Sequence, residues 1–308
     1  MRYLLFAALF TLLSGNISAQ AAKVEFATLQ LSDTIYMIRG RGGNLGISSG
    51  GDGLYIIDDQ VSQVTGPLLD EIRKISNRPI KFIINTHYHS DHTGGNEVFG
   101  ERGALIVAHD NIRTRMSTEQ VSVFRNTTYA PFPDIALPVI TFNDRISLHF
   151  NGETATAYYV ANGHTDGDSI IHFPVSNVIH MGDMYFNKMY PYVDLEAGGA
   201  IQGIVEAADL ALSMADASTR IIPGHGPLAT RDELVAYRDY IVEAIGNVQA
   251  LIDQSMTLTQ VIDAKPTAKW DEELGGVWIT PPQFTTFLYN SLMNIHEYTP
   301  PVSDETSE

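Results

Sequence analysis

Apolar residues along the chain recur with two spacings, one typical of strands and the other of helices. Residues 24–57 predict several short strands, since Thr34–Arg39 and Gly53–Ile57 are rich in β-branched and aromatic side chains and glycine-rich turns lie between them. Between residues 64 and 76 the apolar positions follow a helical period, which predicts a helix. Lys81–Asn85 is a short, mostly apolar run, as in a strand that is buried on both faces.

The second half of the chain repeats this order of strands followed by helices. Strands are predicted at residues 145–150, 154–160, 169–173, 177–181 and 220–222. Helices are predicted at residues 201–215, 233–252 and 282–297. Two halves of this kind favour the α/β class and a sandwich of two mixed sheets with helices outside. No linker or low-complexity stretch interrupts residues 22–300, which we expect to form one domain.

Composition and charge narrow the class of protein. The chain has 308 residues, and its hydrophobic content of 44% is typical of a globular protein. A formal net charge of −17 argues against a nucleic-acid partner, because basic patches are what bind a phosphate backbone. Since cysteine is absent, any metal site has to be built from nitrogen and oxygen ligands. We expect a small-molecule substrate, and the oligomeric state is left open.

Both ends of the chain are predicted to lie outside the fold. Arg2 is followed by an apolar run of 11 residues, Tyr3–Leu13, and Ala19–Ala21 has the small-x-small pattern of a cleavage site. That run is too short to span a bilayer, so residues 1–21 are interpreted as a cleaved signal peptide, with a buried first helix as the alternative. The mature protein is then expected in the periplasm or outside the cell, without membrane attachment. Residues 301–308 are expected to be a disordered acidic tail.

Four potential metal ligands occur within six residues, directly after the strand predicted at 81–85. They are His87, His89, Asp91 and His92. Imidazole and carboxylate groups suit zinc, and the ends of strands are where open α/β sheets present ligands. Because four such residues rarely fall together by chance, a metal site is favoured over the alternative of a polar surface turn.

Three further candidates lie at the ends of predicted strands and beside glycine, which lets the backbone approach a ligand closely. They are His164, Asp183 and His225. With the cluster they bring five histidines and two aspartates to the ends of strands, which predicts a two-metal site. A lone histidine in a loop is usually just solvated, so this prediction depends on the whole set.

These motifs, which occur in order over residues 24–245, resemble those of the metallo-β-lactamase superfamily. The resemblance implies an αβ/βα four-layer sandwich with two Zn²⁺ ions in a groove along one edge. It implies that the first zinc is held by His87, His89 and His164. It implies that the second is held by Asp91, His92 and His225. Asp183 would bridge both ions, as in the glyoxalase II-like and lactonase branches, and Asp58 would support the site from behind.

The resemblance also implies a reaction. In a zinc-dependent hydrolase of this kind a hydroxide that bridges the two metals attacks a carbonyl group, and Asp91 would orient the hydroxide. Two Zn²⁺ ions, two ligand carboxylates and one hydroxide leave a single positive charge, which favours an anionic or carbonyl-bearing substrate.

The branch of the family stays open at this point. Asp183 together with His92 favours lactonase-like or glyoxalase II-like enzymes, whereas export favours β-lactam hydrolysis. We expect an exported hydrolase of cyclic amides, esters or thioesters, with β-lactamase activity that can be weak. The alternative is a lactonase or a glyoxalase II-like thioesterase without β-lactam activity. An iron-dependent oxygenase and a phosphodiesterase are less favoured, because a second domain and a basic surface are missing.

The loop at residues 184–192 is the predicted specificity element, because it follows Asp183 and is rich in aromatic residues. Lys188 is a candidate to hold a substrate carboxylate, and Tyr190 is a candidate to contact the substrate. The alternatives are a merely solvated lysine and ordinary packing beneath a long loop.

Overall fold

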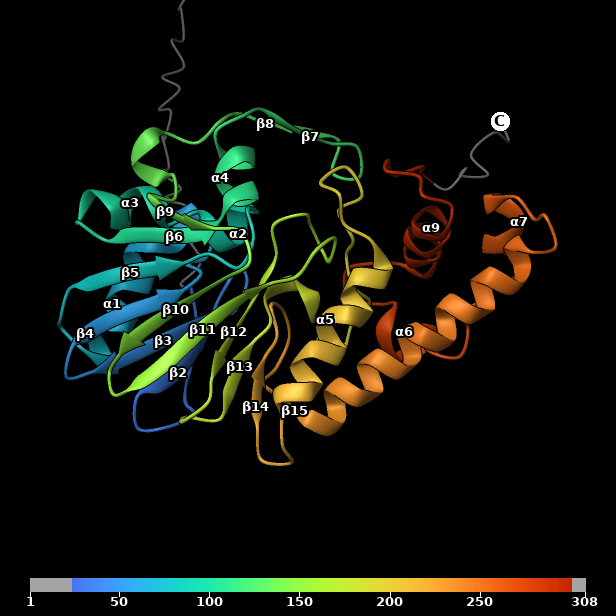
Figure 1. The fold of residues 1–308 in the computed structure, drawn as a ribbon. Helices are drawn as coiled ribbons and strands as arrows, with labels where there is room; N and C mark the ends of the chain where they lie inside the picture. Colours follow the sequence, from blue (N-terminus) through green and yellow to red (C-terminus); the bar gives the residue numbers. More distant parts are fainter. Residues whose placement is uncertain (1–23, 301–308) are drawn as a thin grey trace, which may run out of the picture.

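The computed structural model describes residues 24–300, so the predicted signal peptide and acidic tail lie outside the described residues. Two β-sheets face each other, and helices lie on their outer sides (Figure 1). The first sheet has seven strands in the order β1-β2-β3-β4-β5-β6-β9. Their bounds are β1 Ala27–Gln30, β2 Ile35–Arg39, β3 Leu45–Gly50, β4 Gly53–Ile57, β5 Ile80–Ile84, β6 Leu105–His109 and β9 Ile140–Phe142. Strands β1 to β4 pair antiparallel, whereas β4, β5, β6 and β9 pair in parallel.

The second sheet has six strands in the order β10-β11-β12-β13-β14-β15. Their bounds are β10 Arg145–Phe150, β11 Glu153–Tyr159, β12 Ser169–Phe173, β13 Val178–His180, β14 Arg220–Ile222 and β15 Ala229–Thr230. Neighbouring strands are antiparallel except β13 and β14, which are parallel. Both sheets are therefore mixed, as predicted. A separate hairpin of β7 (Gln120–Ser122) and β8 (Thr127–Tyr129) lies at the top of the molecule in Figure 1.

The helices cover the outer faces of the two sheets. Their bounds are α1 Thr65–Ile75, α2 Ser90–Thr93, α3 Asn96–Glu101, α4 Asp110–Met116, α5 Ile201–Met214, α6 Arg231–Ile252, α7 Leu258–Asp263, α8 Asp271–Leu274 and α9 Pro281–Leu292. Short 3₁₀ turns are η1 Ser62–Val64, η2 Asp134–Ala136 and η3 Gly182–Met184. Helices α5, α6 and α9 pack on one another beside the second sheet (Figure 1).

Strand β4 shows why the chain forms layers. Its side chains alternate between two faces, because successive residues of a strand point in opposite directions. Tyr55 and Ile57 belong to the apolar core between the two sheets. Leu54 and Ile56 belong to the core beneath α1. A strand that is buried on both faces needs apolar residues at every position. With two such sheets and helices outside them, the predicted αβ/βα sandwich is confirmed.

Some element bounds differ from those predicted. Helix α6 begins at Arg231, two residues earlier than predicted, because Thr230 and Glu233 form a capping box at its start. Helix α9 ends at Leu292, whereas the sequence predicted a helix to residue 297. Asn294 adopts a positive φ of 54°, which stops helical hydrogen bonding soon after that end. Within residues 24–300, no helix is long and apolar enough to cross a membrane.

Candidate metal centre

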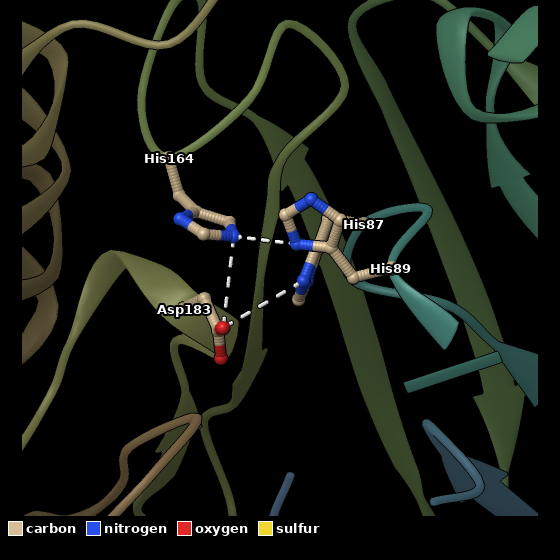
Figure 2. Close-up of side chains that lie close together, drawn as sticks. All are labelled: His87, His89, His164 and Asp183. Carbon is tan, nitrogen blue, oxygen red and sulfur yellow. Dashed lines mark hydrogen bonds and ion pairs between the residues drawn. The ribbon is translucent and has the colours of Figure 1, made fainter. Parts of the chain in front are cut away.

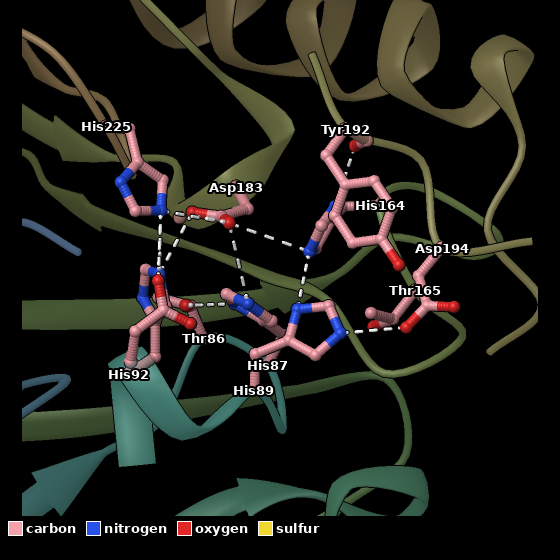
Figure 3. Close-up of polar contacts among 12 residues, drawn as sticks. Thr86, His87, His89, His92, His164, Thr165, Asp183, Tyr192, Asp194 and His225 are labelled. Carbon is pink, nitrogen blue, oxygen red and sulfur yellow. Dashed lines mark hydrogen bonds and ion pairs between the residues drawn. The ribbon is translucent and has the colours of Figure 1, made fainter. Parts of the chain in front are cut away.

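The predicted ligands come together where strands of both sheets end. The cluster that begins at His87 follows β5, and its last two members lie on the single-turn helix α2. His164 lies in the loop between β11 and β12, Asp183 follows β13 in η3, and His225 follows β14. Residues from four separate segments thus converge at one edge of the sandwich (Figure 3).

The first group of donors consists of three imidazoles and one carboxylate, which Figure 2 shows pointing toward one another. These are His87, His89, His164 and Asp183, and their nearest donor atoms all lie within 4.8 Å of one another. His164 Nε2 is 2.8 Å from His89 Nδ1. The Oδ2 atom of Asp183 is 3.7 Å from His87 Nε2 and 3.6 Å from His164 Nε2.

The second group of donors consists of Asp91, His92 and His225. His92 Nε2 and His225 Nε2 are 3.4 Å apart, and the Oδ2 atom of Asp91 is 3.3 Å from His225 Nε2. Asp183 also faces this group, since its Oδ1 is 3.0 Å from His92 Nε2 and its Oδ2 is 3.3 Å from His225 Nε2 (Figure 3). Asp183 therefore stands between the two groups, where a bridging carboxylate would be.

The spacing and chemistry of the donor atoms suit metal coordination better than hydrogen bonding among the donors. His87 Nε2 is buried and has no hydrogen-bond partner among the described residues. Ligands of a tetrahedral zinc ion at about 2.0–2.1 Å are separated from one another by roughly 3.3 Å, which is close to the spacings found here. Neutral imidazole and carboxylate are also ligand types that zinc accepts. The two groups thus suit two divalent cations.

Four of the five ligand histidines are held by a hydrogen bond from the other ring nitrogen. His89 Nε2 donates to Asp194 Oδ2 at 2.8 Å, and His92 Nδ1 donates to Asp58 Oδ2 at 2.8 Å. The Nδ1 of His164 donates to a backbone carbonyl at 2.8 Å, and that of His87 donates to a threonine hydroxyl at 3.0 Å. Such bonds fix the tautomer, so the lone pair of the remaining nitrogen faces the cluster.

Asp58 lies behind His92, where the resemblance implied a supporting carboxylate. It also accepts hydrogen bonds from the amide of Thr86 at 2.7 Å and from the hydroxyl of Thr86 at 2.8 Å. Its backbone adopts a φ of 61°, which is uncommon for a residue other than glycine. The three hydrogen bonds offset that strain and keep the Asp58 carboxylate aimed at His92.

Asp194 is a carboxylate beside a candidate ligand that the sequence did not indicate. It is 1% exposed, and besides His89 it accepts a hydrogen bond from the Tyr88 hydroxyl at 2.8 Å. It lies 105 positions after His89 in the chain and is part of no recognisable motif. Only the fold brings this carboxylate to the back of a ligand.

When no metal is bound, burial and neighbouring charges give histidines of the two donor groups different pKa values. Desolvation lowers the pKa of His164 to about 4 and also lowers the pKa of His87, so both imidazoles are neutral. Desolvation acts in the same direction on His225, but the carboxylates of Asp183 and Asp91 outweigh it and raise its pKa to about 9. Desolvation raises the pKa of Asp183, but the cluster histidines outweigh it, and its pKa lies well below the ordinary value.

Glycine is required beside the ligands. A Cβ at Gly224 would overlap the Oδ1 of Asp183, and a Cβ at Gly43 would overlap the ring of His92. The backbone of Gly224 also donates to the carbonyl of Gly182 at 2.7 Å, which joins the segments that carry Asp183 and His225. The glycines noted in the sequence thus allow close packing around the donors.

The two residues predicted to contact substrate lie elsewhere. Tyr190 is fully buried, stacks on Phe284 with 4.3 Å between ring centroids, and donates a hydrogen bond to Asp271 at 2.8 Å. This corrects the expectation for Tyr190, because a side chain in the core cannot reach a substrate. Lys188 is exposed, but the cavity of about 410 Å³ that it lines contains none of the seven donors.

A different cavity opens beside the metal ligands. It is lined by His89 and Asp91 and by residues of the hairpin β7–β8, among them Arg125 and Tyr129. Its neighbouring aromatic side chains are Tyr192, whose ring centroid is 5.9 Å from that of His89, and Trp278, whose ring centroid is 6.3 Å from that of His225. The sequence did not single out Arg125 or Trp278.

The layered sheets and the seven converging donors define a metal-binding protein of the α/β class. A family model described as the metallo-β-lactamase superfamily matches residues 33–225, and the chain belongs to this superfamily, whose members are metal-dependent hydrolases. The predicted family and fold are thereby confirmed.

Solved structures show the same fold at low sequence identity. A metallo-β-lactamase from Pontibacter korlensis is 17% identical, covers 71% of this chain and 99% of its own, and superposes with a TM-score of 0.58. The DIM-1 metallo-β-lactamase is 17% identical, with coverages of 72% and 100% and a TM-score of 0.57. The stereoselective inverting sec-alkylsulfatase Pisa1 from Pseudomonas sp. is 17% identical, with a TM-score of 0.67. This chain covers 50% of the sulfatase, and the match spans 86% of this chain.

Proposed function

We propose that this chain is an exported dinuclear-zinc hydrolase that cleaves the carbonyl–heteroatom bond of a cyclic amide, an ester or a thioester, β-lactams included. The observation that carries the proposal is the pair of donor groups that share Asp183. Zinc bound there would supply a Lewis acid and a water whose pKa is lowered to about 7. A cleavage without redox change needs no further cofactor, and none of the donors is a cysteine.

Asp91 has the position of a group that handles the attacking water. It lines the cavity beside the metal ligands, and its side chain is 20% exposed, in contrast to the enclosed Asp183 at 3%. Desolvation raises the pKa of Asp91, but His92 and His225 outweigh it, so its pKa lies below the ordinary value and it is a carboxylate at neutral pH. Asp91 can therefore accept a hydrogen bond from the water and orient it toward a carbonyl carbon in the cavity.

The donor set favours one branch of the proposal without excluding β-lactams. All seven donors are histidine or aspartate, which is the set of the lactonase-like and glyoxalase II-like enzymes. A lactonase or thioesterase without β-lactam activity is therefore the main alternative. Alkyl sulfate esters are a further candidate substrate, because the sulfatase match covers 86% of this chain, which is more than the family segment at residues 33–225.

The proposed export depends on residues 1–21 alone, which are outside the described part of the chain. Its support is the apolar run of 11 residues and the small residues that follow it. Expression in a Gram-negative host followed by fractionation and intact-mass measurement tests it. Recovery from the cytoplasm at the full-length mass would contradict export, and this outcome would leave the proposed chemistry unaffected.

The chemistry is tested by metal analysis together with a hydrolysis panel. We expect two zinc ions per chain, and loss of both bound metal and turnover in His87→Ala and His164→Ala. His149→Ala is the matched control, because His149 is exposed on β10 and its Nδ1 contacts only Thr154 Oγ1, at 2.9 Å. The panel contains penicillins, carbapenems, lactones, thioesters, alkyl sulfates and phosphodiesters.

Several outcomes would overturn parts of the proposal. Full activity of His87→Ala or His164→Ala would contradict the metal site as the catalytic centre. Lactone or thioester cleavage without any β-lactam turnover would select the alternative branch. Purified protein that contains iron and consumes oxygen would replace the hydrolase by an oxygenase, and turnover of phosphodiesters alone would replace it by a phosphodiesterase.

A further inference from the structure

We propose that Arg125 forms an anion-binding subsite on an aromatic wall beside the metal centre, so that the substrate is an apolar molecule that carries a carboxylate or sulfate group. This inference rests on the proposed function and names the class of its substrate. It concerns a residue of the hairpin β7–β8, which the sequence analysis did not single out.

Arg125 and the metal ligands face the same cavity. Arg125 lines that cavity together with His89 and Asp91. It lies at the turn of the hairpin, between β7 and β8, and its side chain is exposed. Because this cavity is small, about 30 Å³, it has room for the anionic group of a ligand beside Arg125 and not for a whole substrate molecule.

The charge of Arg125 is not neutralised by the protein. Within residues 24–300 its guanidinium forms no ion pair and donates no hydrogen bond. The contrast is Arg115, which lines the same cavity but binds both carboxylate oxygens of Asp166 at 2.7 Å each. A guanidinium presents a planar fork of donors that matches a carboxylate or a sulfate, and in Arg125 this fork is unused.

Arg125 nevertheless has a defined position. Its guanidinium carbon lies 5.3 Å from the ring centroid of Tyr192 and 5.2 Å from that of Trp278. Stacking on two aromatic faces orients the guanidinium without consuming its hydrogen-bond donors. Desolvation lowers the pKa of Arg125, but Asp91 is the first of several groups that outweigh it, so Arg125 stays charged.

The same aromatic residues connect Arg125 to the metal ligands. Tyr192 lies against His89, Trp278 lies near His225, and the two rings are 5.4 Å apart. Trp278 remains 38% exposed, so part of its surface is open to a ligand. Because Tyr192 is fully buried, an apolar group would pack on the open surface of Trp278, with its reactive carbonyl toward the metals and its anionic group toward Arg125.

Part of this wall lies outside the segment that defines the superfamily. Trp278 precedes α9, whereas the family match ends at residue 225. Phe124, the neighbour of Arg125, contacts both Tyr192 and the α9 residue Phe287, with ring centroids 4.9 Å and 5.4 Å apart. The C-terminal helices thus support the hairpin that carries the cation.

The experiment compares two esters that have the same leaving group and similar size. One is the mono-4-nitrophenyl ester of succinate, which carries a carboxylate, and the other is 4-nitrophenyl butyrate, which is neutral. For the zinc-loaded full-length chain we expect Arg125→Gln to raise KM for the anionic ester about tenfold or more, as for loss of one charge-assisted hydrogen bond, with kcat nearly unchanged. The neutral ester should be hydrolysed as by the wild type, and Arg125→Lys should recover part of the loss.

Arg220→Gln is the matched control. Arg220 is exposed at the start of β14, and its substitution removes the same charge from the end of that strand that is remote from His225. Equal changes for both esters in Arg125→Gln, or the same selectivity loss in Arg220→Gln, would overturn the subsite. A structural role for Arg125 would change both esters together and would lower the unfolding temperature.

A binding measurement distinguishes carboxylate from sulfate, and it tests the subsite independently of the proposed hydrolase activity. Hexanoate and hexyl sulfate are compared with hexanol in calorimetric binding to the zinc-loaded protein. We expect the better-fitting anion to bind at least about tenfold more tightly than hexanol, and Arg125→Gln to abolish that difference. If neither ester is hydrolysed, the proposed function fails, and this binding measurement still decides the subsite. If the anions bind no better than hexanol, the subsite is refuted.

Discussion

The bond between Asp194 and His89 leads to a quantitative prediction about the first metal group. Asp194 is buried, and its Oδ2 accepts from His89 Nε2 at 2.8 Å and from the Tyr88 hydroxyl at 2.8 Å. The bond keeps the proton of His89 on Nε2 and leaves Nδ1 facing His164, where it could bind a metal ion. Removing the charge of Asp194 should therefore weaken zinc binding at a distance, because Asp194 itself is no ligand.

The size of the effect follows from what each substitution leaves behind. Hydrogen bonds to a charged group contribute about 1.5–3 kcal/mol, and about 1.4 kcal/mol corresponds to tenfold in affinity. Asparagine can still accept from His89 Nε2, so Asp194→Asn should weaken binding of one zinc about tenfold. Alanine leaves both His89 and Tyr88 without an acceptor, so Asp194→Ala should weaken it about a hundredfold.

The assay is competition of the metal-free protein with a chelating dye for Zn²⁺, which resolves the two binding steps. Circular dichroism of each metal-free variant shows that the fold is retained. Asp166→Asn is the matched control, because Asp166 binds Arg115 and contacts none of the ligand histidines. Wild-type affinity in both Asp194 variants would refute the reasoning, and so would an equal loss in Asp166→Asn.

Three further predictions follow from the same geometry. Gly224→Ala should reduce zinc binding and turnover severely, since its Cβ would displace the Asp183 carboxylate, and metal analysis of the variant checks this. Zinc binding to the metal-free protein at pH 7 should release a proton from His225, whose pKa is about 9, and should weaken as the pH falls; calorimetry in buffers of different ionisation enthalpy measures the release. Tyr190→Phe should leave kcat and KM unchanged but cost about 1 kcal/mol of unfolding free energy through the lost bond to Asp271, which denaturant unfolding measures.

The strands that lead to the donors, and the seven donors themselves, could be predicted from the sequence because their signals are local, whereas β6 to β9 and β15 were not predicted. Strand β5 is a short apolar run, and His87 follows it within three residues of its end. His225 follows β14 in the same way, and the glycines beside the donors are adjacent to them in the chain. Parallel strands bring their carboxyl ends to the same edge of a sheet, so the position of a residue after a strand already says where it lies.

The residues that the sequence did not reveal act through contacts between distant segments. Asp194 lies in an irregular loop, and Arg125 lies in a hairpin of two three-residue strands without an apolar pattern. The prediction for Tyr190 was wrong because it too depends on a distant segment. An aromatic residue in a loop can face a substrate or the core, and for Tyr190 packing against α9 decides for the core. The end of α9 was predicted too late because Asn294, a residue type that often adopts a positive φ just after a helix, was not taken as a stop signal.

The carboxylates of Asp58 and Asp194 change the net charge expected at the metal centre. From the sequence, two zinc ions with Asp91 and Asp183 as their only carboxylates would leave a positive centre that attracts anions. The structure places the expected Asp58 and the unexpected Asp194 each in a hydrogen bond to a ligand histidine, so four carboxylates face the charge of two divalent ions. With a hydroxide present such a centre would carry no excess positive charge, and attraction of an anionic substrate would then have to come from a separate cation. In the cavity beside the metal ligands, among the described residues, the cation that is not paired with a carboxylate is Arg125.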